Sequence, residues 1–120
     1  MPKITIDTRI KREREQLEKI FAGLDENHRN TAASLIENAA FMAVTLADLR
    51  KTITEEGVVS KYQNGENQWG TKKSPEVEVY NTMVKNQTAI IKTLCDMLPA
   101  GDAEGDALRA WQKANGRAVR

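Results

Sequence analysis

Residues 25–56 carry an apolar repeat that constrains the fold of this chain more than any other feature. Its apolar residues recur at alternating spacings of three and four, the period that keeps one stripe on one side of an α-helix. This stripe predicts a long helix that packs along its length against another helix, either in an α-hairpin or at an interface between subunits. The stripe consists of Ala32, Leu35, Ala39, Met42, Leu46, Leu49 and Ile53.

The composition points to one small domain with a modest core. The chain has 120 residues, of which 29% are charged, and only two Trp, two Tyr and two Phe. A small helical domain with few large core residues often gains stability by associating with copies of itself. The net charge of +1 excludes a generic polycation. Any binding to a polyanion would therefore depend on local basic patches, whose effect is multiplied in a ring of subunits.

Cysteine usage and hydropathy predict a soluble, intracellular protein. The single cysteine, Cys95, excludes an internal disulfide and suits a reducing compartment. The first ten residues lack the continuous apolar run of a signal peptide. No stretch approaches the ~20 apolar residues that cross a bilayer, so we expect no membrane partner.

Capping residues predict three helices, and the apolar residues Leu108 and Trp111 predict a fourth. A first helix is expected from Asp7 to about Ala22, and a second follows from a cap at Asp25 to a stop at Gly57. Ser74 and Pro75 predict the start of a third helix that runs to about residue 98. A short final helix is expected around residues 108–111, after a flexible acidic break at 100–105, and residues from 115 onward are expected to be disordered.

The segment between the second and third helices has the pattern of a β-hairpin over residues 58–72. Asn64-Gly65 is the preferred dipeptide for a two-residue type I′ turn. A turn of those two residues would pair Gln63 with Glu66. The predicted fold is thus mainly α, with long antiparallel helices and one small hairpin. Its parts are a basic helix at 1–24, a helical core at 25–99 and a tail at 100–120.

The sequence gives little support to enzyme chemistry. The only histidine, His28, lies in the first turn of the long helix without a cluster of ligands spaced for a metal. Cys95 follows Leu94 on the third helix, and a small buried hydrophobe explains it better than a nucleophile. Glycine-rich phosphate loops are absent from the sequence. We therefore expect a non-enzymatic protein without a cofactor or metal.

Two groups of basic residues are candidates for contacts with nucleic-acid phosphates. The alternative for the first helix is a solvent-exposed face laced with ion pairs, and the two explanations are equally compatible with its composition. For the hairpin, lysines commonly solubilise strand edges. If these residues bind phosphates, affinity should fall steeply with salt. The candidates are Arg9, Lys11, Arg12 and Arg14 on the first helix, and Lys72 and Lys73 after the hairpin.

Two further groups are candidates for protein contacts. A flexible linker followed by an aromatic anchor is typical of a docking peptide, although this tail could equally fold back on the domain. The docking candidates are Leu108 and Trp111. The oligomer-interface candidates on the two long helices are Leu35, Met42, Leu46, Leu49, Ile53, Tyr80, Ile91 and Leu94.

The order of these parts resembles a known family. A long leucine- and alanine-rich helix ends in Glu55-Glu56-Gly57, and a hairpin around Asn64-Gly65 follows. Lys73-Ser74-Pro75-Glu76 then opens a helix with Tyr80-Asn81, which closes in Leu94-Cys95-Asp96-Met97-Leu98-Pro99. This arrangement, over roughly residues 24–99, resembles the small terminase subunits of tailed bacteriophages.

The resemblance implies a DNA-packaging component in the host bacterial cytoplasm. Such subunits assemble into cyclic homo-oligomers, bind phage double-stranded DNA at the packaging site, and recruit and regulate the large terminase subunit, which carries the ATPase and nuclease activities. The tail from Leu108 onward would engage that large subunit. No DNA-contacting residue is carried over from the family. The competing hypotheses are a helical adaptor that never touches DNA and a small dimeric transcriptional regulator.

Overall fold

The computed structural model is mainly α-helical. It describes residues 4–57, 59–63, 69–73, 75–99 and 103–116. Within these ranges, the elements in chain order are α1 (Ile6–Ile20), α2 (Glu26–Glu56), β1 (Val59–Gln63), β2 (Trp69–Lys73), α3 (Pro75–Asp96) and α4 (Ala103–Gly116). The predicted long helix is confirmed as α2, which has 31 residues.

The ends of the long helix follow the predicted capping chemistry. The side chain of Asp25 accepts a hydrogen bond from the backbone N–H of His28 at 2.8 Å. At the other end, Gly57 adopts φ 86° and ψ 177°, a conformation that only glycine adopts without strain. Pro75 begins α3, as expected, whereas the predicted serine cap before it lies outside the described residues.

The start of the first helix differs from the prediction. Thr5, rather than Asp7, caps α1, because its hydroxyl accepts a hydrogen bond from the backbone N–H of Thr8 at 3.1 Å. Asp7 instead lies in the first turn, where its charge is favourable beside the positive end of the helix dipole.

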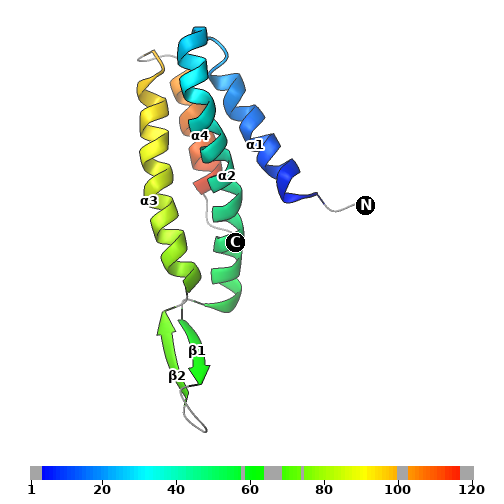
Figure 1. Ribbon diagram of the computed structural model, residues 1–120, viewed down its shortest axis with the longest axis vertical. Coiled ribbons are helices and arrows are strands. Elements are labelled where there is room, and N and C mark those ends of the chain that lie inside the picture. Colours follow the sequence, from blue (N-terminus) through cyan, green and yellow to red (C-terminus); the bar gives the residue numbers. More distant parts are fainter. Residues whose placement is uncertain (1–3, 58, 64–68, 74, 100–102, 117–120) are drawn as a thin grey trace.

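Helices α2 and α3 lie side by side and antiparallel, and the two strands connect them at one end (Figure 1). The register pairs Gln63 with Trp69 and Tyr62 with Gly70. The predicted pairing of Gln63 with Glu66 is therefore wrong: five residues, 64–68, separate the paired strands rather than two. An Asn-Gly dipeptide is also compatible with longer loops, so it located the reversal of the chain but not the register.

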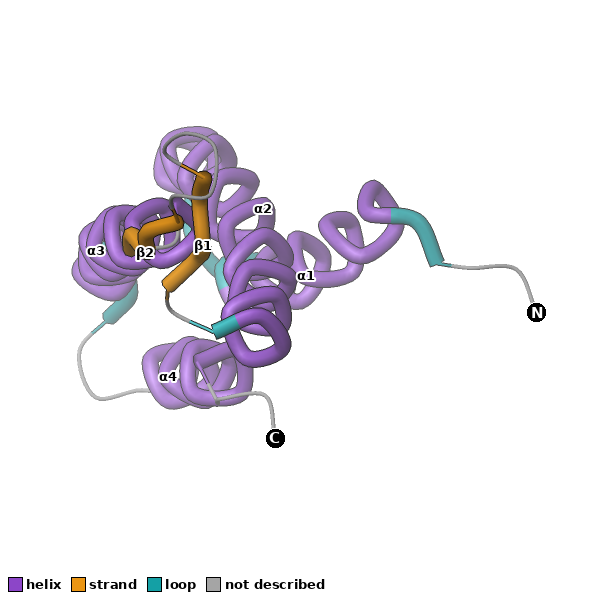
Figure 2. The backbone as a smooth tube through the Cα atoms, turned by 90° about the horizontal axis from the view of Figure 1, so that it is seen from below, coloured by secondary structure: helices purple, strands orange, loops and turns teal. Residues whose placement is uncertain are grey.

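The remaining two helices pack on different sides of this pair. Helix α1 contacts α2 and diverges from it toward the N-terminal end, whereas α4 lies behind α2, between α1 and α3 (Figures 1 and 2). The molecule is elongated: its radius of gyration is 17.9 Å and its extents are 63 × 36 × 25 Å. A compact domain of this length would have a radius of gyration of about 14 Å.

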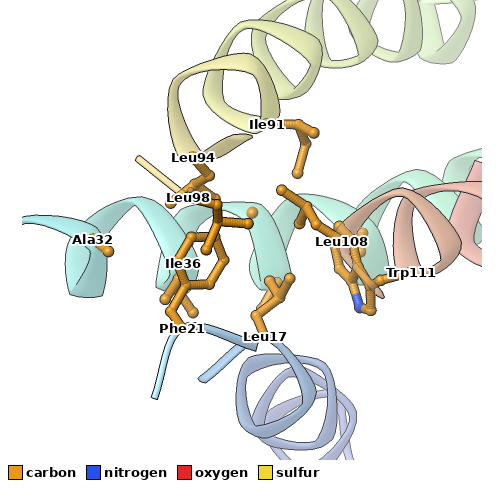
Figure 3. Packing of buried hydrophobic residues seen from close by; sticks show 12 residues of the cluster. Leu17, Phe21, Ala32, Ile36, Ile91, Leu94, Leu98, Leu108 and Trp111 are labelled. Atoms are coloured by element: carbon orange, nitrogen blue, oxygen red, sulfur yellow. The ribbon is translucent and has the colours of Figure 1, made fainter. Parts of the chain in front are cut away.

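The core lies where all four helices meet, at the end of the molecule opposite the strands (Figures 1 and 3). Leu17 and Phe21 enter it from α1 and its C-terminal end, and Leu94 enters from α3. Alanines on α2 allow the other helices to approach closely. The predicted segments 1–24, 25–99 and 100–120 thus all contribute to one core. Its buried members are Leu17, Phe21, Ala32, Ile36, Ala39, Ala40, Ala43, Ile91, Leu94, Leu98, Leu108 and Trp111.

The hydropathy of α2 differs from the prediction. By length and composition alone, α2 is long and apolar enough to cross a membrane, contrary to the expectation that no stretch approaches that size. A core helix of a soluble protein passes the same test. Here α2 is the central helix, which packs against both α1 and α3. Its many alanines raise the hydropathy and at the same time fit a helix that is packed on two sides.

Candidate interaction surface

The predicted DNA-binding residue Arg9 has a structural partner. Its guanidinium donates hydrogen bonds to both carboxylate oxygens of Asp48, at 2.9 and 3.1 Å. This bidentate pair connects the diverging part of α1 to α2. Arg9 is thus already engaged within the chain, and its role as a phosphate contact stays a prediction.

The other basic residues of α1 fall into two groups. Lys11 and Arg12 are exposed on the helix surface. Arg14 is half-buried, and its Nε lies 3.9 Å from a carboxylate oxygen of Glu18 one turn later. The predicted cluster is therefore split, and of its four members Lys11 and Arg12 are the two that are exposed. Lys72 and Lys73 belong to β2, and their side chains lie outside the described part of the structure.

Three of the eight predicted oligomer-interface residues are buried inside the chain. Leu46, Ile91 and Leu94 are buried, with Leu94 fully inaccessible. As contacts with another subunit these three are wrong, because the antiparallel α2–α3 pair and its neighbours already cover them. The sequence left open whether the stripe serves an α-hairpin or an interface, and these positions serve the hairpin. The half-buried members of the set are Leu35, Met42, Leu49, Ile53 and Tyr80.

The predicted docking residues Leu108 and Trp111 are also buried. Leu108 is 1% exposed and Trp111 is 6% exposed, and both belong to the common core (Figure 3). The Trp111 indole N–H donates to a carboxylate oxygen of Glu13 at 3.0 Å. The structure therefore corrects the docking prediction: α4 folds back on the domain. Glu13, which interrupts the apolar stripe of α1, supplies the acceptor that a buried indole requires.

The end of α4 is ordered by polar contacts that the sequence did not suggest. Asn115, expected to begin a disordered tail, lies in the last turn of α4 and donates to Glu13 at 3.4 Å and to the Trp111 carbonyl at 3.0 Å. Its carbonyl accepts a hydrogen bond from Arg50 at 3.4 Å. Arg50 also donates to the Tyr80 hydroxyl at 2.8 Å, so Tyr80 joins α3 to α2 within one chain. No local motif would reveal these contacts, because their partners are up to 102 residues apart.

Two of the hollows between helices in the described part of the chain present apolar side chains. The first, which we call the groove, lies between α2 and α3 and has a volume of about 320 Å³. It is lined by Met42, Glu78, Val79, Thr82, Met83 and Asn86. The second, which we call the notch, lies where α1 diverges from α2 and has a volume of about 540 Å³. It is lined by Asp7, Ile10, Arg14, Glu37, Asn38 and Phe41.

The titratable side chains of the described residues form no cluster of metal ligands. No three His, Cys, Asp or Glu side chains gather there closely enough to hold a metal ion. His28 serves the helix start, since its backbone N–H and its ring nitrogen both contact Asp25. These hydrogen bonds, chiefly the one from the His28 backbone, lower the pKa of the Asp25 carboxyl from its ordinary value of 3.8. Cys95 is half-buried at the edge of the core.

No protein-family model, characterised relative or solved structure matches this chain. Its function is therefore inferred from its own residues and from the order of its elements.

Proposed function

We propose that this chain is the small terminase subunit of a phage DNA-packaging machine. In this role it forms a cyclic homo-oligomer in the host bacterial cytoplasm, binds double-stranded phage DNA at the packaging site, and recruits and regulates the large ATPase and nuclease subunit. The observation that supports this most is the order of its central elements. The 31-residue α2 ends at Gly57, an antiparallel strand pair follows, and α3 begins at Pro75, which is the arrangement on which the resemblance to that family depends.

Exposed positive charge on α1 supports the DNA-binding part of the proposal. Lys11 and Arg12 lie on the helix surface, away from the core residue Leu17. One copy carries few such charges, but several copies around one DNA molecule would present them repeatedly, and phosphate contacts supply most non-specific affinity for DNA. The oligomer is therefore part of the DNA-binding mechanism, because a single chain with a net charge of +1 has no strong overall field.

The experiment is a salt titration of DNA binding by fluorescence anisotropy with a duplex from the packaging region. The variant Lys11→Ala/Arg12→Ala should bind more weakly. The slope of log affinity against log salt should become shallower by about 0.9 for each phosphate that a DNA-bound copy of the variant no longer neutralises. A matched control is Lys85→Ala/Lys92→Ala, which removes two exposed lysines from α3 instead of α1. Equal affinity and equal slope for the first variant and the wild type would refute the assignment.

A helical adaptor without DNA binding is the second candidate. The groove and the notch favour it, because apolar hollows between helices are the surfaces that accept partner helices. Native mass spectrometry and a gel shift separate the candidates. A closed ring that shifts DNA supports the terminase role, a dimer that shifts DNA supports a transcriptional regulator, and a protein that shifts no DNA supports the adaptor.

A further inference from the structure

The notch exposes apolar side chains that the described part of the chain does not cover. Phe41, in the middle of α2, is 48% exposed, and Ile6, near the start of α1, is 57% exposed. Phe41 and Ile10 line the notch, whereas Ile6 precedes Ile10 by four residues on the same face of α1. The cause lies in the path of α1: the apolar stripe that buries Leu17 continues to Ile6, but the helix has by then diverged from α2 (Figures 1 and 2). That end of the stripe therefore has no covering helix within the described part of the chain.

The apolar surface is flanked by an acidic and a basic residue, so the notch of one copy is electrostatically complementary to the notch of a second copy. Asp7 and Arg14 both line the notch, three residues before and four residues after Ile10. If a second α1 is laid antiparallel across the first, with the crossing just after Ile10, Asp7 of each copy lies opposite Arg14 of the other. The ion pair of Arg14 with Glu18 is long at 3.9 Å and half-exposed, which leaves guanidinium donors for a second carboxylate. Glu37 adds a further acidic group beside Arg14.

From this we infer that the notch binds the notch of a second copy through a two-fold contact. The apolar centre is formed by Ile10 and Phe41 of both copies, and an Asp7–Arg14 pair lies on each side of it. A two-fold contact uses the same patch on both chains, which requires the patch to be self-complementary. None of the residues that line the notch belongs to α4, and α1 and α4 lie on different sides of α2 (Figure 2).

This two-fold contact is additional to the proposed function and is compatible with it. Lys11 and Arg12 do not line the notch, so their charges stay available to DNA in the paired state. If the notch contact and a cyclic contact coexist, two rings are joined back to back and the number of subunits is even. If the notch contact acts alone, the assembly is a dimer.

The first test measures the mass of the full chain without DNA by analytical ultracentrifugation over a range of concentrations. Phe41→Asp places a charge at the centre of the contact and should raise the dissociation constant by roughly 30-fold or more, as for a central aromatic contact. The matched control is Val79→Asp, because Val79 is equally exposed at 49% and lines the groove instead. Far-UV circular dichroism verifies that both variants keep their helices.

The second test reverses the charges. Asp7→Lys or Arg14→Glu alone brings like charges together and should weaken association about tenfold. The double variant Asp7→Lys/Arg14→Glu restores opposite charges and should recover most of the affinity, which a merely structural role for either residue would not produce. Unchanged association for Phe41→Asp, dissociation by Val79→Asp alone, or no recovery in the double variant would each overturn the inference. A ring that survives Phe41→Asp with its mass unchanged would overturn the inference and leave the proposed function intact.

Discussion

Replacing Trp111 by alanine tests whether α4 is a part of the domain or a free docking tail. Trp111 is 6% exposed and belongs to the core together with Leu108, and its indole donates to Glu13 at 3.0 Å. Truncation of a buried tryptophan typically costs about 3–5 kcal/mol, because apolar burial is removed and a cavity remains. The free energy of unfolding of native proteins is about 5–15 kcal/mol, so Trp111→Ala should remove a large share of it.

Trp111→Phe separates the packing from the hydrogen bond. It keeps an aromatic ring in the core and removes the indole donor, so we expect a destabilisation of about 1 kcal/mol. Asn115 continues to donate to Glu13 in that variant, which limits the cost. The difference between the two variants, about 2–4 kcal/mol, is the packing contribution of the part of the side chain that a phenyl ring replaces.

The assay is urea denaturation followed by far-UV circular dichroism at one fixed protein concentration, because association would shift the midpoint. Lys113→Ala is the control, since Lys113 is exposed on the same helix and should change the free energy of unfolding by less than about 0.5 kcal/mol. If Trp111→Ala unfolds within that same margin of the wild type, then α4 does not pack as described, and the tail would regain its role as a candidate for docking to a partner.

Three further perturbations test individual features of the fold. In a double-mutant cycle, Arg9→Ala and Asp48→Ala should show a coupling free energy below about 1 kcal/mol that falls with added salt, because both side chains are partly exposed; a larger, salt-independent coupling would contradict this. Gly57→Ala should cost about 1–3 kcal/mol in urea unfolding through backbone strain alone, since a Cβ there meets nothing within 4 Å, and a neutral effect would refute the positive φ. Because the folded pKa of Asp25 is lowered, its contribution to stability is complete above pH 3.8 and disappears as the pH falls through the folded value. Asp25→Asn should therefore flatten the acid side of a thermal-stability profile measured against pH, and an unchanged profile would refute the role of the carboxylate.

Local chemistry made several elements predictable. Helix α2 and its two ends depend on interactions within a few residues, and these can be recognised in the sequence. They are the three-and-four spacing of its apolar residues, the carboxylate of Asp25 and the flexibility of Gly57. The same holds for Pro75 at the start of α3. The hairpin shows where local reasoning ends, since Asn64-Gly65 indicated a reversal but the strands pair Gln63 with Trp69. Register depends on the packing of both strands, which a dipeptide does not encode.

The candidate surfaces were less predictable, because exposure is a property of the packed chain. Leu94 and Phe41 are both large apolar residues on long helices, yet the Leu94 side chain is inaccessible and Phe41 is 48% exposed. The difference arises from the direction of α1, which diverges from α2 and opens the notch. In the sequence, Arg9 and Arg12 are equivalent basic residues of one helix. The fold distinguishes them, because it places Asp48, 39 residues away, beside Arg9.

The amino-acid order alone was thus enough to establish that the chain is helical, where its long helices begin and end, and that it contains more apolar stripes than one helix pair needs. Which of these stripes the chain's own helices cover, and which remain open, depends on how the helices are arranged in space. The physical reason is that helix formation depends on hydrogen bonds and contacts within about four residues, whereas burial depends on the angles at which distant helices cross.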